Sequence, residues 1–279
     1  MRVMTLLAAT VAALVAGVAT GSADLAFAAA GQPTDWAMGF QDSASPVMDD
    51  LIWFDNILLV LITVISVFVL LLLLIIMVRF NAKKNPEPSK TTHNTLIEVI
   101  WTVAPIMILV MIAVPSFRLL YKQMEVPEAD VTIKAIGYQW YWGYEYPDDG
   151  LEFEALMLED DELAEGQPRL LATDTEVVVP VNKVVRMQIT AEDVIHSWAI
   201  PSFGVKMDGV PGRLNETWFK ATEVGTYYGQ CSELCGIRHA FMPITVKVVT
   251  QEEYDEWLLW AKEEYAAAPS AYNVADTQR

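Results

Sequence analysis

The chain has 279 residues, a length that suits one or two domains together with membrane segments. Apolar residues make up 53% of it and charged residues 19%, and the net charge is −18. Residues 119–279 carry 28 acidic and 12 basic side chains, so most of the negative charge lies there. This balance argues against nucleic acid as a partner. It suits a basic protein partner, although solubility alone would also explain it.

Residues 1–30 have the plan of a signal peptide. Arg2 gives a positive start, an apolar Leu/Ala/Val stretch follows, and small residues at 26 and 28–30 resemble an A-x-A cleavage site. A third membrane anchor is the alternative, but residues 3–20 are rich in alanine and glycine and only weakly apolar. We expect cleavage near residues 28–30, followed by a polar periplasmic segment over residues 31–50.

Two uncharged apolar runs follow, over residues 57–78 and 99–117. Each is long enough to cross ~30 Å of hydrocarbon as a helix. The linker between them has more basic than acidic residues, and positive charge in a short loop marks the cytoplasmic side. Residues 51–118 are therefore predicted to form a transmembrane hairpin with a cytoplasmic loop and with both ends in the periplasm.

Residues 119–265 are predicted to form an all-β domain that ends in a helix. Apolar residues alternate with polar ones in short β-branched and aromatic runs, which are separated by turn residues such as those at 147–150, 208–209 and 211–212. The predicted strands are Val131–Gly137, Tyr141–Tyr146, Glu176–Val181, Val184–Thr190, Ile195–Ile200, Glu216–Ala221, Thr226–Gln230 and Ile244–Val249. Many short strands at such spacing indicate a sandwich or barrel.

Three further segments complete this region. Residues 159–169 are expected to be an exposed insertion, and residues 251–265 an amphipathic helix with acidic residues in its first turn. Residues 266–279 are expected to be a C-terminal tail.

The segment CSELCGIRHAFM at 231–242 concentrates possible metal ligands. They are Cys231, Cys235, His239 and Met242, and His196 lies 35 residues before the first cysteine. Thiolates, imidazoles and a thioether are soft ligands that suit copper. A single blue-copper centre uses one cysteine, so the second cysteine here favours two copper ions bridged by two thiolates.

Two alternatives for the cysteines stay open at this point. Two cysteines outside the cytoplasm could form a disulfide, and two cysteines with two histidines could hold zinc. The histidine and methionine on the same loop favour copper, because the chain has only three histidines. A haem attached through CxxCH is excluded by the spacing.

Four segments resemble subunit II of cytochrome c oxidase, of the haem–copper oxidase family in bacteria and mitochondria. They are HNTLIEVIWT (93–102), GYQWYWGYEY (137–146), DVIHSWAIPSFGVKMDGVPGR (193–213) and YYGQCSELCGIRHAFMP (228–243). The first 40 residues and residues 155–170 add nothing to this resemblance. One departure is Tyr138, where many relatives have histidine.

The resemblance implies a two-helix hairpin followed by a cupredoxin-like Greek-key barrel that holds the dinuclear CuA centre. The implied copper ligands are the side chains named above and the backbone carbonyl of Glu233. The Glu233 carboxylate is expected to reach a magnesium or manganese ion at the boundary with subunit I.

The aromatic run 137–146 is also given a role by the resemblance. Trp140 is expected to take the electron from cytochrome c. Alternation along a strand would place Trp140 and Trp142 on one face and Tyr141 on the other, and core packing is the simpler explanation for several of these rings. Carboxylates are expected to dock the basic cytochrome, more weakly as ionic strength rises: Glu145, Asp148, Asp149 and Asp193.

The remaining expectations concern the complex. Glu98 is expected at the mouth of a proton pathway into subunit I, with an ordinary interfacial carboxylate as the alternative. The chain would pass electrons to the haem of subunit I, where oxygen is reduced to water with proton pumping, and subunit III is a further expected partner. A quinol-oxidase subunit would lack the copper ligands, nitrous oxide reductase would lack the hairpin, and a copper carrier would have no need of Trp140.

Overall fold

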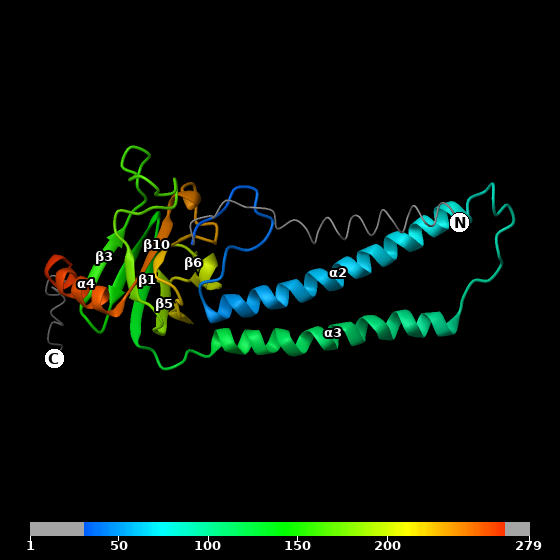
Figure 1. Cartoon of the computed structure of the whole chain (residues 1–279), viewed down its shortest axis with the longest axis horizontal. Coiled ribbons are helices and arrows are strands. Elements are labelled where there is room, and N and C mark those ends of the chain that lie inside the picture. The colour runs from blue at the N-terminus through cyan, green and yellow to red at the C-terminus, as the bar shows by residue number, and fades with distance from the viewer. Residues whose placement is uncertain (1–30, 266–279) are drawn as a thin grey trace, which may run out of the picture.

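The computed structural model describes residues 31–265 (Figure 1). Two long helices, α2 and α3, extend side by side from one side of a β domain. The predicted signal peptide over residues 1–30 and the predicted tail over residues 266–279 lie outside the described residues.

Helix α2 (Pro46–Arg79) has clear start and stop signals. Ser45 caps its first turn by accepting a hydrogen bond from the backbone nitrogen of Met48, and a proline suits the first helical position. At the other end, the Asn81 side chain donates to the carbonyl oxygens of Met77 and Val78. The helix therefore begins several residues before the predicted apolar run.

Helix α3 (Thr95–Met124) is capped by Asn94, whose side chain accepts from two backbone nitrogens of the first turn. It continues seven residues past the predicted apolar run, which ends at 117. Both helices are long and apolar enough to cross a membrane, and their apolar windows are not buried within the chain. Exposed apolar side chains along whole helices are expected where the surface faces lipid.

The β domain contains ten strands between residues 131 and 249, arranged in two main sheets and a two-stranded ribbon. One sheet has the order β3-β2-β1-β5-β8, the second has β4-β10-β9, and β6 pairs with β7. The strands are β1 (Val131–Tyr138), β2 (Tyr141–Tyr146), β3 (Leu151–Ala155), β4 (Val177–Pro180), β5 (Val185–Ala191), β6 (His196–Ile200), β7 (Val205–Gly209), β8 (Asn215–Phe219), β9 (Gly225–Gln230) and β10 (Pro243–Val249).

The core lies between the sheets. Alternate side chains of β5 are buried, as are those of β3, while β6 is buried throughout. Trp142, Trp198 and Phe219 are among the largest fully buried side chains. The fold class predicted from the sequence, a two-helix hairpin followed by an all-β cupredoxin-like domain, is confirmed.

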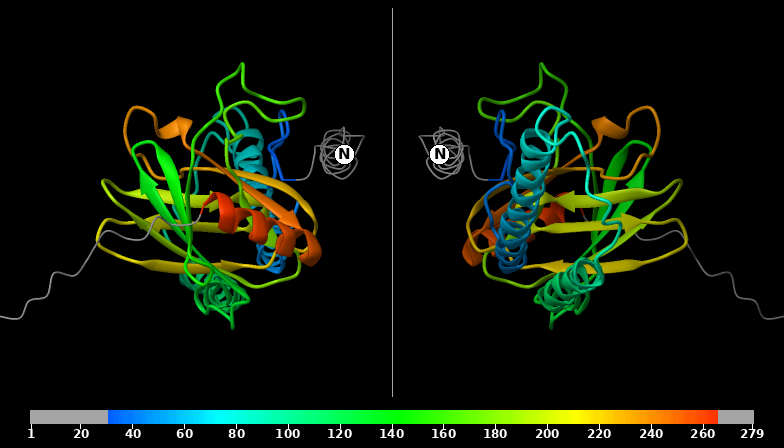
Figure 2. Two further views of the ribbon diagram at one scale, coloured as in Figure 1. Left: turned by 90° about the vertical axis from the view of Figure 1, so that its left-hand side faces the viewer. Right: turned by 90° about the vertical axis from the view of Figure 1, so that its right-hand side faces the viewer.

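Helix α4 (Gln251–Glu264) lies on the side of the β domain away from the hairpin, as the end-on views of Figure 2 show. Thr250 and Glu253 form a capping box at its start. Trp257 packs against Tyr146 of β2, with ring centroids 5.4 Å apart. The helix thus covers the region between β2 and β4, in agreement with the helix predicted over residues 251–265.

The hairpin is fixed to the β domain at the domain end of both helices. The Ser45 hydroxyl donates to the Phe203 carbonyl at 2.7 Å. The Lys122 ammonium pairs with Asp50, and the Trp218 indole donates to the Lys122 carbonyl at 3.0 Å. These contacts hold the β domain in a defined position relative to the membrane helices.

Two strands were not predicted, and one predicted turn is wrong. Strand β3 is an edge strand of five residues in which glutamates alternate with buried Leu151, Phe153 and Ala155. Asp208 and Gly209 were predicted as a turn but belong to β7, where a side chain on Gly209 would lie 2.6 Å from the Thr190 carbonyl oxygen. The glycine therefore marks a close approach of two backbones.

The predicted sharing of one strand face by Trp140 and Trp142 is also wrong. Tyr138 pairs directly with Tyr141 across the β1–β2 hairpin, so Gln139 and Trp140 form its two-residue turn. Trp142 is fully buried, whereas Trp140 is partly exposed beside the loop after β9.

Candidate metal centre

The candidate ligands come together where β6 begins, β9 ends and β10 begins. His196 is the first residue of β6, Cys231 follows β9 directly, and Met242 immediately precedes β10. Strands β9 and β10 are antiparallel neighbours, so residues 231–242 close the connection between them. The backbone nitrogen of Ser232 donates to the Ser197 carbonyl at 2.9 Å, which ties this loop to β6.

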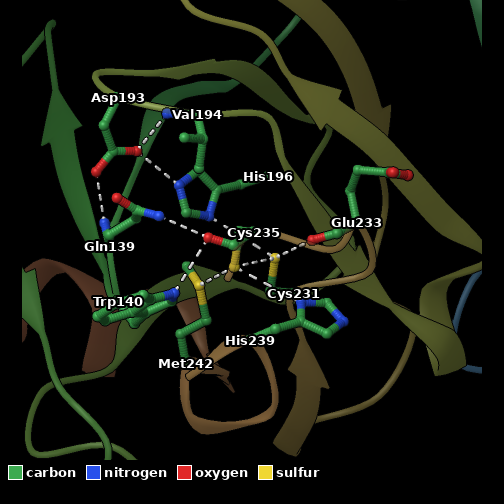
Figure 3. A network of polar contacts seen from close by, with 10 residues as sticks. All are labelled: Gln139, Trp140, Asp193, Val194, His196, Cys231, Glu233, Cys235, His239 and Met242. Carbon is green, nitrogen blue, oxygen red and sulfur yellow. Dashed lines mark hydrogen bonds and ion pairs between the residues drawn. The ribbon is translucent and has the colours of Figure 1, made fainter. Parts of the chain in front are cut away.

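The two cysteine sulfurs lie at the middle of the cluster, 3.9 Å apart (Figure 3). Cys231 Sγ is 3.8 Å from His196 Nδ1, and Cys235 Sγ is 3.6 Å from His239 Nδ1. Each thiol therefore has its own imidazole nitrogen. Met242 Sδ lies 3.5 Å from Cys235 Sγ, and the Glu233 carbonyl oxygen lies 3.3 Å from Cys231 Sγ.

His196 is held on three sides. Its Nε2 lies 2.9 Å from Asp193 Oδ1, which leaves Nδ1 directed at Cys231. Trp142 contacts the ring edge-on, with centroids 5.9 Å apart. A side chain on Gly137 would lie 2.7 Å from ring atoms of His196, so the glycine leaves the space that the imidazole fills. A histidine with a carboxylate on its second nitrogen is the usual arrangement of a metal ligand.

The two thiols differ in their tendency to ionise. Burial opposes ionisation of Cys231, but hydrogen bonds from His196 and from the backbone outweigh it and lower its pKa. Burial and the negative charge of Cys231 raise the pKa of the Cys235 thiol. Two adjacent thiolates in a buried site need a compensating cation, so this chemistry fits a metal ion better than two free thiols.

The geometry bears on the alternatives that the sequence left open. Both cysteines are buried and have free thiols. A metal site requires free thiols, whereas a disulfide would join the two sulfurs. Ligand atoms of His196, Cys231 and Cys235 lie within 4.8 Å of one another. A tetrahedral zinc site would be complete with two cysteines and two histidines, whereas here a thioether and a carbonyl oxygen also converge. These six donors suit two soft ions that share the sulfurs.

Trp140 lies directly against the loop over residues 231–242, which carries most of the candidate ligands (Figure 3). Its indole nitrogen is 3.3 Å from the Cys235 carbonyl oxygen, and the Gln139 side chain donates to the same oxygen at 2.7 Å. Gly236 has φ +129°, and a side chain there would lie 2.9 Å from the Trp140 ring. The glycine thus allows the indole to rest on the loop.

Glu233 has its two functional groups on different sides. Its carbonyl oxygen faces Cys231, whereas its carboxylate points away from the sulfurs (Figure 3). The residue is exposed, so the carboxylate is accessible to a partner.

The four predicted docking carboxylates do not form one cluster. Asp193 accepts hydrogen bonds from the backbone nitrogens of Gln139 and Val194 and thus lies at the Trp140 turn. Glu145 pairs with Lys134 on the outer face of the sheet. Asp148 and Asp149 follow the opposite end of β2, about 20 Å from Trp140 by strand rise, and Asp149 pairs with Lys262 of α4.

Glu98 lies in the first turn of α3, and this end of the helix is the one farther from the β domain (Figure 1). Its backbone carbonyl accepts from the Thr102 hydroxyl. The residue is half-buried, whereas the other residues of the first turn are exposed.

Sequence reasoning missed three supporting residues and one role. Gln139, Gly137 and Gly236 shape the site without carrying ligand atoms, and their roles follow from tertiary contacts that no local pattern reveals. Asp193 was predicted for docking alone, yet it also orients His196. Its position three residues before a candidate metal-binding histidine was an available signal, because such histidines need a partner for their second nitrogen.

Comparisons with known proteins agree on one family. The family model described as cytochrome c oxidase subunit II, transmembrane domain, matches residues 33–119, and that described as cytochrome c oxidase subunit II, periplasmic domain, matches residues 131–249.

Individual relatives share much of the chain. A probable cytochrome c oxidase subunit 2 of Rickettsia felis is 56% identical over 230 residues, covering 82% of this chain and 73% of the relative. Cytochrome c oxidase subunit 2 of Cereibacter sphaeroides is 48% identical over 275 residues, covering 88% and 91%. Among solved structures, the periplasmic domain of subunit II of cytochrome oxidase of Bradyrhizobium japonicum is 59% identical, with a TM-score of 0.48, covering 51% of this chain and all of that one.

Proposed function

The chain belongs to the cytochrome c oxidase subunit II family, and on that premise we propose that it takes single electrons from cytochrome c at a dinuclear copper centre. It is a membrane-anchored subunit of a haem–copper oxidase, an oxidoreductase. The electrons then pass to the haem of subunit I, which reduces oxygen to water with proton translocation. The observation that carries this proposal is the pair of buried free thiols, each with its own imidazole nitrogen.

His196, Cys231, Cys235, His239, Met242 and the Glu233 carbonyl would hold the copper. When bound, the copper pair supplies a shared electron whose transfer changes bond lengths little. The protein contributes rigidity. His196 is fixed by Asp193, the loop is tied to β6, and both cysteines are buried. A site that cannot relax requires little reorganisation on each transfer, and exclusion of water limits it further.

Trp140 is the proposed point of electron uptake. Its indole combines partial exposure with a 3.3 Å contact from its nitrogen to the Cys235 carbonyl oxygen. A docked cytochrome could therefore reach the ring. The ring contacts the backbone of Cys235, and the sulfur of the same residue is a proposed copper ligand. Asp193 beside this turn supports docking of a basic partner there, while Glu145, Asp148 and Asp149 would act through the field of the acidic domain.

The remaining roles concern orientation and the oxidase complex. We propose that the loop between α2 and α3 is cytoplasmic and that the β domain is periplasmic, in the cell membrane. The exposed Glu233 carboxylate would complete a magnesium or manganese site with subunit I. Glu98 at the cytoplasmic start of α3 would stand at the mouth of a proton pathway, and subunit III is a further proposed partner.

Copper loading of the detergent-solubilised chain tests the proposed centre. We expect two copper ions per chain and a purple centre whose EPR hyperfine pattern shows one unpaired electron on two copper nuclei. The measurements are metal analysis, visible absorption and EPR. A blue spectrum with one copper ion per chain would instead support a single-copper carrier, and a chain that binds no copper would contradict both.

Replacing Asp193 with asparagine should weaken copper binding. The amide cannot supply the negative charge that makes His196 a stronger ligand, and loss of such a partner costs about tenfold to a hundredfold in metal affinity. Competition with a copper chelator would measure the change without cytochrome c, which separates this role from docking. Glu192→Gln is the matched control, because it removes the same charge one residue away. Equal affinities for the two variants would show that Asp193 has no effect on the ligand.

A further inference from the structure

A groove of about 720 Å³ lies between helix α4, strands β4 and β10, and the loop over residues 156–175. Its apolar lining includes Val178 and Val249, which are largely buried, and Leu158, which is half-buried. The groove shares no residue with the candidate copper ligands. Helix α4, whose residues form one wall of it, lies on the side of the domain away from the hairpin (Figures 1 and 2). It is therefore a surface that the copper centre does not explain.

Aromatic rings from α4 and its C-terminal end form one wall of this groove. Trp257 is held in place by Tyr146 and Tyr254, with ring centroids 5.4 and 5.7 Å away. Trp260 meets Tyr265 edge-on at 5.3 Å and leaves half of its side chain exposed. An exposed tryptophan in a fixed position offers a ring face to a ligand.

The charges that line the groove are mostly negative. Four carboxylates contribute to it, Glu162, Asp174, Glu176 and Glu253, against one lysine. That lysine, Lys247, is 3.5 Å from Glu176 and is therefore already paired. The groove thus carries an excess of negative charge next to aromatic rings.

These carboxylates are fixed by the fold. Glu253 accepts a hydrogen bond from the Thr250 backbone nitrogen in the capping box of α4, and this bond lowers the pKa of the carboxyl. Asp174 accepts from the Leu156 nitrogen at 2.7 Å, and Glu162 accepts from the Glu159 nitrogen at 2.9 Å. Their positions would change little on binding, so a ligand would meet a preorganised site.

We propose that this aromatic and acidic groove docks a basic segment of a partner protein, with an arginine or lysine side chain held between Trp260 and the carboxylates. A cation over an indole face gains from the ring quadrupole, and the surrounding carboxylates add attraction. The apolar residues of the groove suit the aliphatic stem of such a side chain. The groove therefore provides a second contact surface, separate from the Trp140 turn.

Fluorine NMR of the full chain in detergent, labelled with fluorotryptophan, tests this docking. The probe is a capped peptide of four arginines, compared with a peptide in which neutral citrulline replaces each arginine. We expect the Trp260 resonance, assigned from Trp260→Phe, to shift with the arginine peptide and not with the citrulline peptide. A Trp260 signal that ignores both peptides, or responds equally to both, would overturn the proposal.

Two variants test whether the groove itself is responsible. Glu162→Lys should weaken peptide binding by about threefold to thirtyfold, the range expected for losing attraction of this kind. Glu263→Lys on α4 makes the same charge change outside the groove and should leave binding nearly unchanged. Equal weakening by both would mean that only net charge matters. If the peptide binds only after residues 266–279 are removed, the occupant is the chain's own C-terminal segment, and the proposed partner is wrong.

Discussion

Replacement of Cys235 by serine is expected to abolish the proposed dinuclear copper centre while leaving the β domain folded. The two side chains have nearly the same shape, and Cys235 makes no disulfide. A serine hydroxyl does not ionise near neutral pH and is a poor ligand for copper, so the variant would lack the second of the two sulfurs proposed to hold the copper ions. Cys231 and His196 remain 3.8 Å apart and can hold at most one ion.

Metal analysis and EPR would measure this loss directly. We expect the copper content to fall from two ions per chain to one or none, with no spectrum of a shared electron. Oxidase assembled with the variant should retain about 1% or less of its cytochrome c oxidation rate, equivalent to ~2.7 kcal/mol or more of added barrier. Ser232→Ala is the control on the same loop, because the Ser232 backbone bond to Ser197 is kept. A variant that still binds two ions with a shared electron would rule out Cys235 as a bridge.

The fold was largely predictable because its patterns are local. Uncharged runs of about twenty residues specify membrane helices wherever they occur, and alternation identifies strands such as β2, whose predicted and observed bounds coincide. Strand β3 escaped prediction because Glu152 and Glu154 alternate with apolar residues over only five positions. Its burial depends on pairing with β2, which is a tertiary property.

The candidate ligands could also be predicted from the sequence, since most of them share one short loop. The residues that position these ligands could not be predicted in this way. Gly137 contacts His196 across 59 positions of chain, and Gln139 reaches Cys235 across 96. Such contacts follow from strand register, which no local pattern specifies. The register also places Trp140 in a turn and not in a strand, and this position brings its indole to the candidate metal-binding loop.

Replacement of Trp140 is expected to slow electron uptake strongly, because its ring is the only group proposed to carry the electron from a docked cytochrome to the candidate copper loop. Trp140→Leu removes the indole and its contact with the Cys235 carbonyl oxygen but touches no ligand atom. We expect normal copper content and EPR signal, with electron uptake from cytochrome c slowed by about tenfold or more, or ~1.4 kcal/mol of barrier.

Stopped-flow measurement of copper reduction by cytochrome c separates this step from later steps in the oxidase. Trp36→Leu is the matched control, because it removes a tryptophan that is 98% exposed and far from the loop in sequence. A change in the copper spectrum of Trp140→Leu would mean that the indole supports the ligands instead of carrying the electron. An unchanged spectrum with an unchanged rate would place electron uptake elsewhere on the acidic domain. A slow rate with an intact spectrum would assign electron uptake to the turn that contains Trp140. Gly236 leaves space for the indole of this turn, and Asp193 accepts a hydrogen bond from its backbone at Gln139.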